Sequence, residues 1–405
     1  MATNVWTSSS VRSISPPTLS PSTIFLHRHR HRRLRRRQLI PTMSSADPLT
    51  AIGRLLWGRA LPPQALVSAV RSTWSATWHL MMSQLAPSDP TSGSYSRPPS
   101  PFPSVPDLYL RPRNSNTLHL YAALPCPWAH RALIVRALKN LESLIPVSIA
   151  APGPHGSWEF RRGSDGGDLA PGPDRANGRQ TLREVYGLRR GGYDGRSTVP
   201  MLWDAERKEV ACNESYGIIT FFNSFGDGSG PDLSPPELKG EIEEWNRLIY
   251  PAINNGVYRC GFAQSQGAYD AAVSELFTTL DQLEFHLSTS RYLCGDTLTL
   301  ADVCLFTTLI RFDLVYNVLF KCSKKKLLEY RNLYAYTCDI YQIPKVAETC
   351  NFEAIMDGYY QILFPLNPGG IRPVMPSDCE HEFLSKPHNR ESLFSDTKCR
   401  QLQAS

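Results

Sequence analysis

The pattern of apolar and polar positions divides the chain into a part that mixes strands with helices and a later part that contains helices only. LHLYAAL (118–124) and VSIAA (147–151) have strand composition, and WAHRALIVRALKNL between them repeats apolar residues at helical spacing. TVPMLWD (198–204) and EVACN (209–213) predict two more strands joined by a tight turn, and ESYGIITFF begins another helix. The order βαβ followed by ββα predicts an α/β domain over residues 116–230.

The second part extends from residue 236 to about residue 360 and carries apolar stripes at three-and-four spacing. They occur in ELKGEIEEWNRLIY, AYDAAVSELFTTLDQLEFHLS, LADVCLFTTLIRFDLVYNVLF and LLEYRNLYAYTCDIYQI. Thr299 and Asp302 have the spacing of a capping box, which is a structural signal without a catalytic role. The sequence therefore predicts an all-α C-terminal domain over 236–360 and an extended tail over 361–405, clamped on the body.

Two other regions lack a regular pattern. Residues 50–85 are weakly amphipathic, and the Pro/Ser-rich stretch SDPTSGSYSRPPSPFPSVP follows them, so we interpret residues 47–115 as an N-terminal extension and linker. Residues 152–196 interrupt the α/β pattern with Gly, Pro and Asp, apart from a short helical patch at TLREVYGL. An irregular stretch of this length inside a domain is usually functional or disordered.

The basic charge of the chain is confined to its beginning. The formal net charge is +6 at pH 7, but residues 1–46 contain eight arginines and no acidic residue, so the remainder has a small negative excess. A Ser- and Arg-rich, acid-free segment is typical of an organelle transit peptide. A nucleic-acid-binding or nuclear-localisation arm and plain disorder are the alternative interpretations. We predict the plastid stroma as the location, with the cytosol as the alternative, and no nucleic-acid partner for the body.

The cysteines and the apolar runs exclude several classes of protein. Ten cysteines are scattered along the chain, and no two are closer than ten positions. Zinc sites and CxxC redox pairs need tighter spacing, so we predict no metal and mostly reduced thiols. No apolar run approaches the ~18 residues that a membrane-spanning helix needs, and we predict no membrane span.

One cysteine stands where a strand ends and a helix begins, in the sequence LPCPWAHR. A helix N-terminus with unpaired amides favours the thiolate form, so we expect the pKa of Cys126 to be lowered into the range of about 3.5–7.5. Pro127 suits the first helical turn. Ala129 occupies the place of the second cysteine of a dithiol oxidoreductase, so an external thiol must resolve any mixed disulfide that Cys126 forms. The alternative is a buried apolar cysteine.

Two further motifs favour a reactive thiol. Thr198, Val199 and Pro200 begin a strand, and a cis proline there leaves the preceding backbone free to pair with a bound peptide. Asn213, Glu214 and Ser215 open the next helix and offer amides, a hydroxyl and a carboxylate to an amino-acid-like group. Taken alone, the first motif fits a proline on an edge strand, and the second fits an ordinary helix cap. In this order they are typical of a thioredoxin-like domain that binds glutathione.

The chain resembles the glutathionyl-hydroquinone reductases, which are the xi class of glutathione transferases, from about Ser96 to Arg390. The motifs are CPWAHR, TVPMLWD, NES, NNGVY, LTLADVCLFTTLIRFDLVY, DIYQIP and KPHNR. The chain is similar in particular to the plant, plastid-type branch. The resemblance implies the glutathione transferase fold: an α/β thioredoxin-like N-terminal domain plus an all-α C-terminal domain.

The resemblance also implies roles for single residues. Cys126 is the nucleophile, Tyr258 is the proton donor that faces the hydroquinone, and Tyr316 and Tyr359 hydrogen-bond near the thiolate and help to keep it ionised. A phenol is a credible acid because it donates one proton and packs against an aromatic substrate. The resemblance also implies a set of residues that bind glutathione. They are Trp158, Arg196, Ser197, Thr198, Val199, Glu214 and Ser215.

We therefore expect a glutathione-dependent enzyme that reduces S-glutathionyl-hydroquinones through a Cys126–glutathione mixed disulfide, with glutathione as co-substrate and no metal. An omega-like thioltransferase or dehydroascorbate reductase shares the cysteine but differs in the second site. A non-catalytic glutathione-transferase-like module that assembles with partners is the alternative from another class. Members of the family pair as dimers, so we expect a homodimer.

Overall fold

The computed structural model describes residues 63–109, 117–153, 157–162, 167–226 and 229–393. The predicted presequence, residues 1–46, lies outside these ranges. The chain consists of two compact units, residues 1–67 and 68–405, and the second contains every feature described below apart from the first turn of one helix. Among the described residues, no helix combines the length and the apolar character that a bilayer crossing requires.

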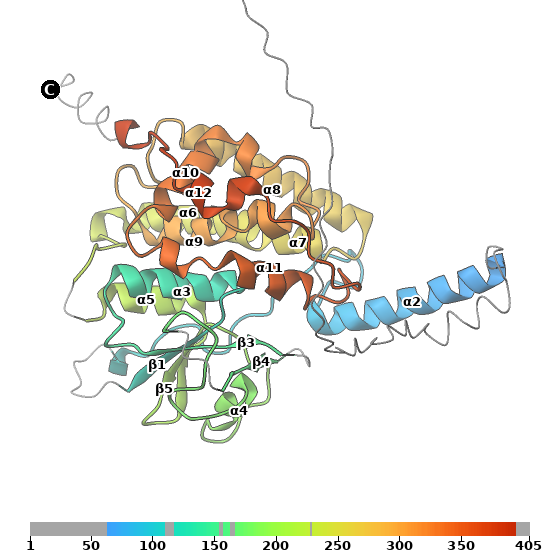
Figure 1. Ribbon diagram of the computed structural model, residues 1–405, viewed down its shortest axis with the longest axis horizontal. Coiled ribbons are helices and arrows are strands. Elements are labelled where there is room, and N and C mark those ends of the chain that lie inside the picture. Colours follow the sequence, from blue (N-terminus) through green and yellow to red (C-terminus); the bar gives the residue numbers. More distant parts are fainter. Residues whose placement is uncertain (1–62, 110–116, 154–156, 163–166, 227–228, 394–405) are drawn as a thin grey trace, which may run out of the picture. The chain divides into compact units, whose positions relative to one another are not determined.

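The predicted α/β domain is built on a four-stranded mixed sheet (Figure 1). Its strand order is β2-β1-β5-β6, in which β1 runs parallel to β2 and antiparallel to β5, as a thioredoxin-like sheet requires. A second sheet pairs β3 with β4. The elements in chain order are β1 (Leu118–Ala122), α3 (Pro127–Leu138), β2 (Val147–Ile149), β3 (Ala151–Pro152), β4 (Trp158–Glu159), α4 (Leu182–Gly187), β5 (Met201–Asp204), β6 (Glu209–Cys212) and α5 (Ser215–Ser224).

Helix α3 is the central element of this unit. It packs against α5 and β1 on one side and against a helix of the C-terminal domain, α9, on the other. Every residue of α3 is buried, including the basic side chains of His130, Arg131 and Arg136. A helix that is surrounded in this way must provide a partner for each polar side chain, because an unpaired buried polar group is costly.

The C-terminal domain is built from helices and helical turns, as predicted, with two isolated β-bridges between Tyr292 and Thr297. Two of the turns are π-helical: η3 follows α6 directly, and two residues separate η4 from the end of α9. The helices are α6 (Lys239–Ile249), α7 (Gly256–Gly261), α8 (Gln266–His286), α9 (Leu300–Leu309), α10 (Arg331–Tyr341), α11 (Phe352–Tyr360) and α12 (His381–Leu384), with turns η3 (Tyr250–Asn254), η4 (Phe312–Tyr316), η5 (Leu327–Glu329) and η6 (Ala347–Thr349).

The capping box at the start of α9 is confirmed. The Asp302 carboxylate is fully buried and accepts hydrogen bonds from the backbone and hydroxyl of Thr299, from the Leu293 amide and from the Tyr336 hydroxyl. Burial raises the pKa of this carboxyl, although all four donors favour the charged form. Its role is structural, because its oxygens are fully used in joining α9 to α10.

The segment that composition describes as a linker is packed against the α/β domain. The Asn213 amide donates to the Phe102 carbonyl at 3.0 Å, and the Phe102 amide donates to the Asn213 side chain at 3.3 Å. Gly217 on α5 allows a close approach, since a Cβ there would lie 2.4 Å from the Pro103 carbonyl oxygen. Prolines remove backbone donors and favour a stiff, extended conformation. Such a segment has no apolar periodicity, so its packing cannot be predicted from the sequence pattern.

Helix α2 (Gln64–Leu85) precedes this segment, and most of its side chains are exposed. Its contact with the C-terminal tail is made by two tryptophans. The Trp78 indole donates to the Pro365 carbonyl at 3.0 Å, and the Trp74 ring meets the Phe364 ring edge-on.

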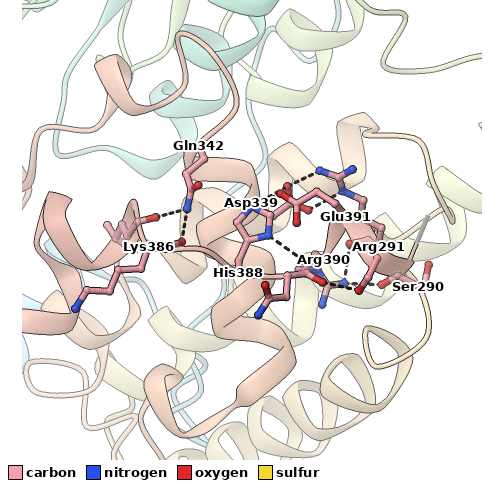
Figure 2. Close-up of polar contacts among 11 residues, drawn as sticks. Ser290, Arg291, Asp339, Gln342, Lys386, His388, Arg390 and Glu391 are labelled. Carbon is pink, nitrogen blue, oxygen red and sulfur yellow. Dashed lines mark hydrogen bonds and ion pairs between the residues drawn. The ribbon is translucent and has the colours of Figure 1, made fainter. Parts of the chain in front are cut away.

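The C-terminal tail returns across α8 and α10, where a group of residues that we call the C-terminal clamp fixes it (Figure 2). The guanidinium of Arg390, which is 2% exposed, donates to the carbonyls of Leu287, Ser290 and Arg291. Gln342 donates to the Leu384 and Lys386 carbonyls. Asp339 accepts two hydrogen bonds from Arg291, and its carboxylate lies 3.6 Å from the His388 ring. The C-terminal clamp comprises Arg291, Asp339, Gln342, His388 and Arg390.

We predict that Arg390→Met weakens this clamp. The variant leaves one buried and two partly buried carbonyls without this donor, so the free energy of unfolding should fall by about 3 kcal/mol. Chemical denaturation measures this loss. Arg372→Met is the matched control, because the ion pairs of Arg372 with Glu353 and Asp357 are exposed and screened by water, so the loss of stability should be much smaller. If both variants lose the same free energy of unfolding, the C-terminal clamp does not make the large contribution to stability that we propose.

Candidate active site

Cys126 lies at the junction of β1 and α3, as the sequence predicted. It is the N-cap residue of α3 with extended backbone angles (φ −74°, ψ 118°), and Pro127 is the first helical residue. The Cys126 amide donates to the Ala123 carbonyl, and its own carbonyl accepts from the His130 amide. The thiol is therefore presented by a tight turn directly at the helix N-terminus.

The sulfur faces the loop that precedes β5. The Cys126 thiol lies 3.5 Å from the Val199 carbonyl oxygen, to which it can donate. The peptide bond between Val199 and Pro200 is cis, which confirms the prediction for this proline. Thr198, the residue before, accepts a hydrogen bond from the Tyr186 hydroxyl through its carbonyl. The Tyr186 hydroxyl thus holds this loop in place, and the loop brings the cis proline close to the thiol.

The expected lowering of the thiol pKa is not what the structure shows. Burial raises the pKa of Cys126 above its ordinary value, because a thiolate there loses contact with water. The amides of Ala129 and Trp128 and the charges of Arg97 and Arg311 act in the opposite direction. The helix N-terminus therefore contributes as predicted, but desolvation outweighs it.

The three predicted tyrosines come from separate elements and meet in one cluster. Tyr258 lies on α7, Tyr316 ends η4 and Tyr359 lies on α11. The Tyr258 and Tyr359 hydroxyl oxygens are 2.6 Å apart, and those of Tyr316 and Tyr359 are 3.1 Å apart. The ring of Phe320 packs against all three tyrosines. Tyr359 therefore stands between the other two hydroxyls.

Burial keeps these phenols protonated. It raises the pKa of Tyr258 and of Tyr359 well above the ordinary value, and it raises the pKa of Tyr316 as well. Charge on Cys126 would raise the pKa of Tyr258 and Tyr316 further, so thiol and tyrosines lie within electrostatic reach. Among the described residues, the hydroxyls of Tyr316 and Tyr359 bond to tyrosine rather than to the Cys126 sulfur. The cluster therefore presents protonated hydroxyls.

The residues expected to bind the γ-glutamyl end of glutathione open helix α5. Glu214 is its N-cap residue and Ser215 its first residue. The Glu214 carboxylate accepts from the Ser100 hydroxyl at 2.8 Å and from the Ser215 hydroxyl at 3.3 Å. Arg131 of α3 donates to the Ser215 hydroxyl and, at 2.8 Å, to the Asn254 side chain. This end of the site is therefore polar, charged and tied to both domains.

The other predicted glutathione residues lie around the loop and the small sheet. Trp158 is a half-buried residue of β4, paired with Pro152 of β3. Arg196 is exposed and Ser197 is half-buried, in the stretch before the cis proline. Among the described residues, neither Trp158 nor Arg196 makes a hydrogen bond or ring contact to Cys126.

Two residues at this site gave no signal in the sequence. Arg97 lies over the Trp128 ring, 4.2 Å from its centroid, on which Arg131 also packs at 4.4 Å. Ser100 contacts Glu214, as described above. Both belong to the Pro/Ser-rich stretch, whose composition is that of a linker. Arg131 stands within the CPWAHR motif, where its charge could have marked it as a site residue.

A cavity of about 310 Å³ lies beside the turn that presents the thiol. Leu124 and Pro125 line it from the α/β domain, and Asp357 and Gly358 line it from α11. A Cβ on Gly358 would come within 2.4 Å of Pro125, so glycine permits this contact. Among the described residues, no group of three His, Cys, Asp or Glu side chains is placed to hold a metal ion.

Comparison with known proteins gives the same assignment for both domains. Residues 125–224 match the model of the glutathione S-transferase N-terminal domain, and residues 266–337 match that of the C-terminal domain. The chain is similar to glutathionyl-hydroquinone reductase YqjG of Escherichia coli (39% identical over 340 residues, covering 80% of this chain and 98% of YqjG). It is also similar to glutathionyl-hydroquinone reductase PcpF of Sphingobium chlorophenolicum, at 44% identity over 64% of this chain and 82% of PcpF.

Two solved structures agree with these relatives. The glutathione-bound structure of YqjG matches with a TM-score of 0.63 and 43% identity, over 68% of this chain and 88% of that one. The xi-class glutathione transferase of Natrialba magadii matches with a TM-score of 0.67 and 36% identity, over 73% and 89% of the two chains. This chain belongs to the xi-class glutathione transferases, the family of the glutathionyl-hydroquinone reductases.

Proposed function

We propose that this protein reduces S-glutathionyl-hydroquinones to hydroquinones with glutathione as the reductant. The observation that carries the proposal is the pairing of a single thiol, presented at the start of α3 beside a cis proline, with a cluster of three protonated tyrosines. The thiol can attack sulfur, and the phenols can supply the proton that a departing carbon needs. The two similar bacterial proteins are named glutathionyl-hydroquinone reductases.

The first step consumes the conjugate. The Cys126 thiolate attacks the glutathione sulfur, a sulfur–sulfur bond forms, and the bond between that sulfur and the ring carbon breaks. The electron pair of this bond goes to the ring carbon, which takes a proton from Tyr258. The hydroquinone leaves, and Cys126 remains as a mixed disulfide with glutathione.

The second step restores the thiol. A second glutathione loses its thiol proton, which restores Tyr258 by way of solvent, and its thiolate attacks the glutathione sulfur of the mixed disulfide. This step releases glutathione disulfide and the Cys126 thiolate. Ala129 stands where a dithiol enzyme would have its second cysteine, so no thiol in the motif can compete for this step. The two sulfur atoms of glutathione disulfide carry the oxidation that balances reduction of the ring carbon.

Tyr258→Phe should separate the two reactions that Cys126 can perform. Loss of a positioned acid typically costs ~10²–10⁴-fold, so kcat on glutathionyl-menadiol should fall by at least about tenfold, since water can substitute as donor. Activity on a small glutathione mixed disulfide should persist, because the leaving thiolate needs no proton on carbon. Steady-state kinetics on both substrates measures the difference.

Two variants serve as controls for this experiment. Tyr316→Phe leaves the Tyr258–Tyr359 bond intact and should have the smaller effect on glutathionyl-menadiol. Cys126→Ser should abolish both reductions while glutathione still binds. If Tyr258→Phe slows both substrates equally, Tyr258 maintains the site and is not the donor. If the mixed disulfide is the much better substrate of the wild type, the protein is an omega-like thioltransferase.

We also propose that the protein is a homodimer. Several large apolar side chains of the tail remain exposed, among them Ile371 at 76% and Val374 at 92%. Large apolar side chains that stay exposed along one segment favour a protein partner. Light scattering should give about the mass of two chains at micromolar concentration, and a monomer would refute the assembly. Ile371→Glu with Val374→Glu should shift the mass toward one chain.

Finally, we propose that the Arg-rich, acid-free presequence directs the protein to the plastid stroma. A fluorescent fusion that carries residues 1–60 should enter plastids of a plant cell, whereas a fusion that begins at residue 47 should remain in the cytosol. Accumulation of the first fusion in the nucleus, in mitochondria or evenly through the cell would exclude this location.

A further inference from the structure

Arg311, directly after α9, is a fully buried cation with an unusual set of partners. Its exposed fraction is 0%, and its guanidinium donates to the carbonyls of Leu124 at 3.0 Å, Pro125 at 3.1 Å and Thr307 at 2.8 Å. A further bond of 2.9 Å goes to Nδ1 of His130. Three of these four acceptors belong to the other domain, to the stretch that surrounds Cys126.

No carboxylate contacts Arg311 within the described part of the chain. Arg291, by contrast, forms a bidentate pair with Asp339 in the C-terminal clamp. All partners of Arg311 are neutral, since Arg311 can only donate and His130 must accept at Nδ1. A buried charge without a counter-charge is costly, and this one is retained beside the thiol.

The imidazole of His130 is neutral and extends the contact. Because its Nδ1 accepts, the proton is on Nε2, which donates to the Thr349 hydroxyl at 2.8 Å, and that hydroxyl donates to the Val346 carbonyl at 2.7 Å. Burial and the charge of Arg311 lower the pKa of His130 well below its ordinary value. Arg311 donates to His130, and His130 and Thr349 each accept one hydrogen bond and donate one, so both ring nitrogens of His130 have partners.

These contacts fix Cys126 from both directions along the chain. Leu124 and Pro125 precede it directly, and His130 lies one helical turn after it. A planar guanidinium presents its donors in a rigid fork, and lysine cannot reproduce this geometry. The position of the sulfur at the start of α3 is therefore set by a side chain of the C-terminal domain.

The charge of Arg311 also acts on the groups around the sulfur. It lowers the pKa of Cys126, of Tyr316 and of Tyr359. Within the described part of the chain, Arg97 also lowers the pKa of Cys126, and it lies half-exposed over Trp128. Water and salt screen an exposed charge more strongly than a buried one.

We propose that Arg311 is the positioning residue of Cys126: it fixes the turn that presents the sulfur and is the buried counter-charge of the thiolate. This role rests on Cys126 being the reactive thiol of the proposed function. It differs from a merely structural contact between domains, because it requires that the reactivity of the sulfur depends on Arg311.

The test measures the reactivity of Cys126 in the full chain. The rate of alkylation by iodoacetamide is followed against pH, with the Cys126 peptide quantified by mass spectrometry. In Arg311→Met, the midpoint of the profile should rise and alkylation at pH 7 should be about tenfold slower, because the thiolate loses its buried partner. In Arg311→Lys, the midpoint should stay near that of the wild type, while kcat on a small glutathione mixed disulfide falls about tenfold with little change in KM.

Arg390→Met is the matched control, because it removes a second buried guanidinium in the C-terminal clamp, away from Cys126. It should lower stability and leave the alkylation profile unchanged. A folded Arg311→Met protein with the wild-type profile overturns the proposal, and so does an equal change in Arg390→Met. If Arg311→Met does not fold, a wild-type kcat in Arg311→Lys overturns it. Alkylation needs no hydroquinone, so this test stands even if the proposed substrate is wrong.

Discussion

The complete burial of helix α3 is the constraint on which the rest of the structure depends. The helix carries three basic side chains into the interior, and each forms hydrogen bonds with a different part of the molecule. Arg136 donates to carbonyls of the loop before β2, Arg131 reaches the start of α5 and Asn254, and His130 reaches Arg311 and Thr349. Polar contacts of one helix thereby join the sheet, the expected glutathione end and the C-terminal domain.

This arrangement explains how the reactive groups are divided between the domains. The α/β domain contributes the sulfur, the cis proline and the start of α5, whereas the C-terminal domain contributes all three tyrosines. Neither domain contains the whole site. The contacts of α3 with β1 and with α9 hold the thiol and the tyrosine hydroxyls relative to each other.

Local patterns in the sequence predicted the elements and their order, because apolar period, helix caps and turns depend on neighbours in the chain. They also identified Cys126, Pro200 and the tyrosines, the last only through the family resemblance. They failed where the cause is tertiary. The desolvation of Cys126 depends on the residues that pack over it in the fold. The contact of Ser100 with Glu214 and the contacts of Arg311 produce no periodic pattern in the sequence.

The packed stretch before β1 sets a limit on how small a working version of this protein can be. Ser100 is bonded to the carboxylate of Glu214, and Phe102 exchanges two hydrogen bonds with Asn213. A fragment that begins at β1 would contain the complete sheet and the thiol. It would lack the residues that pack against Asn213 and Glu214 at the start of α5. A fragment that keeps these contacts must therefore begin before Ser100, well upstream of β1.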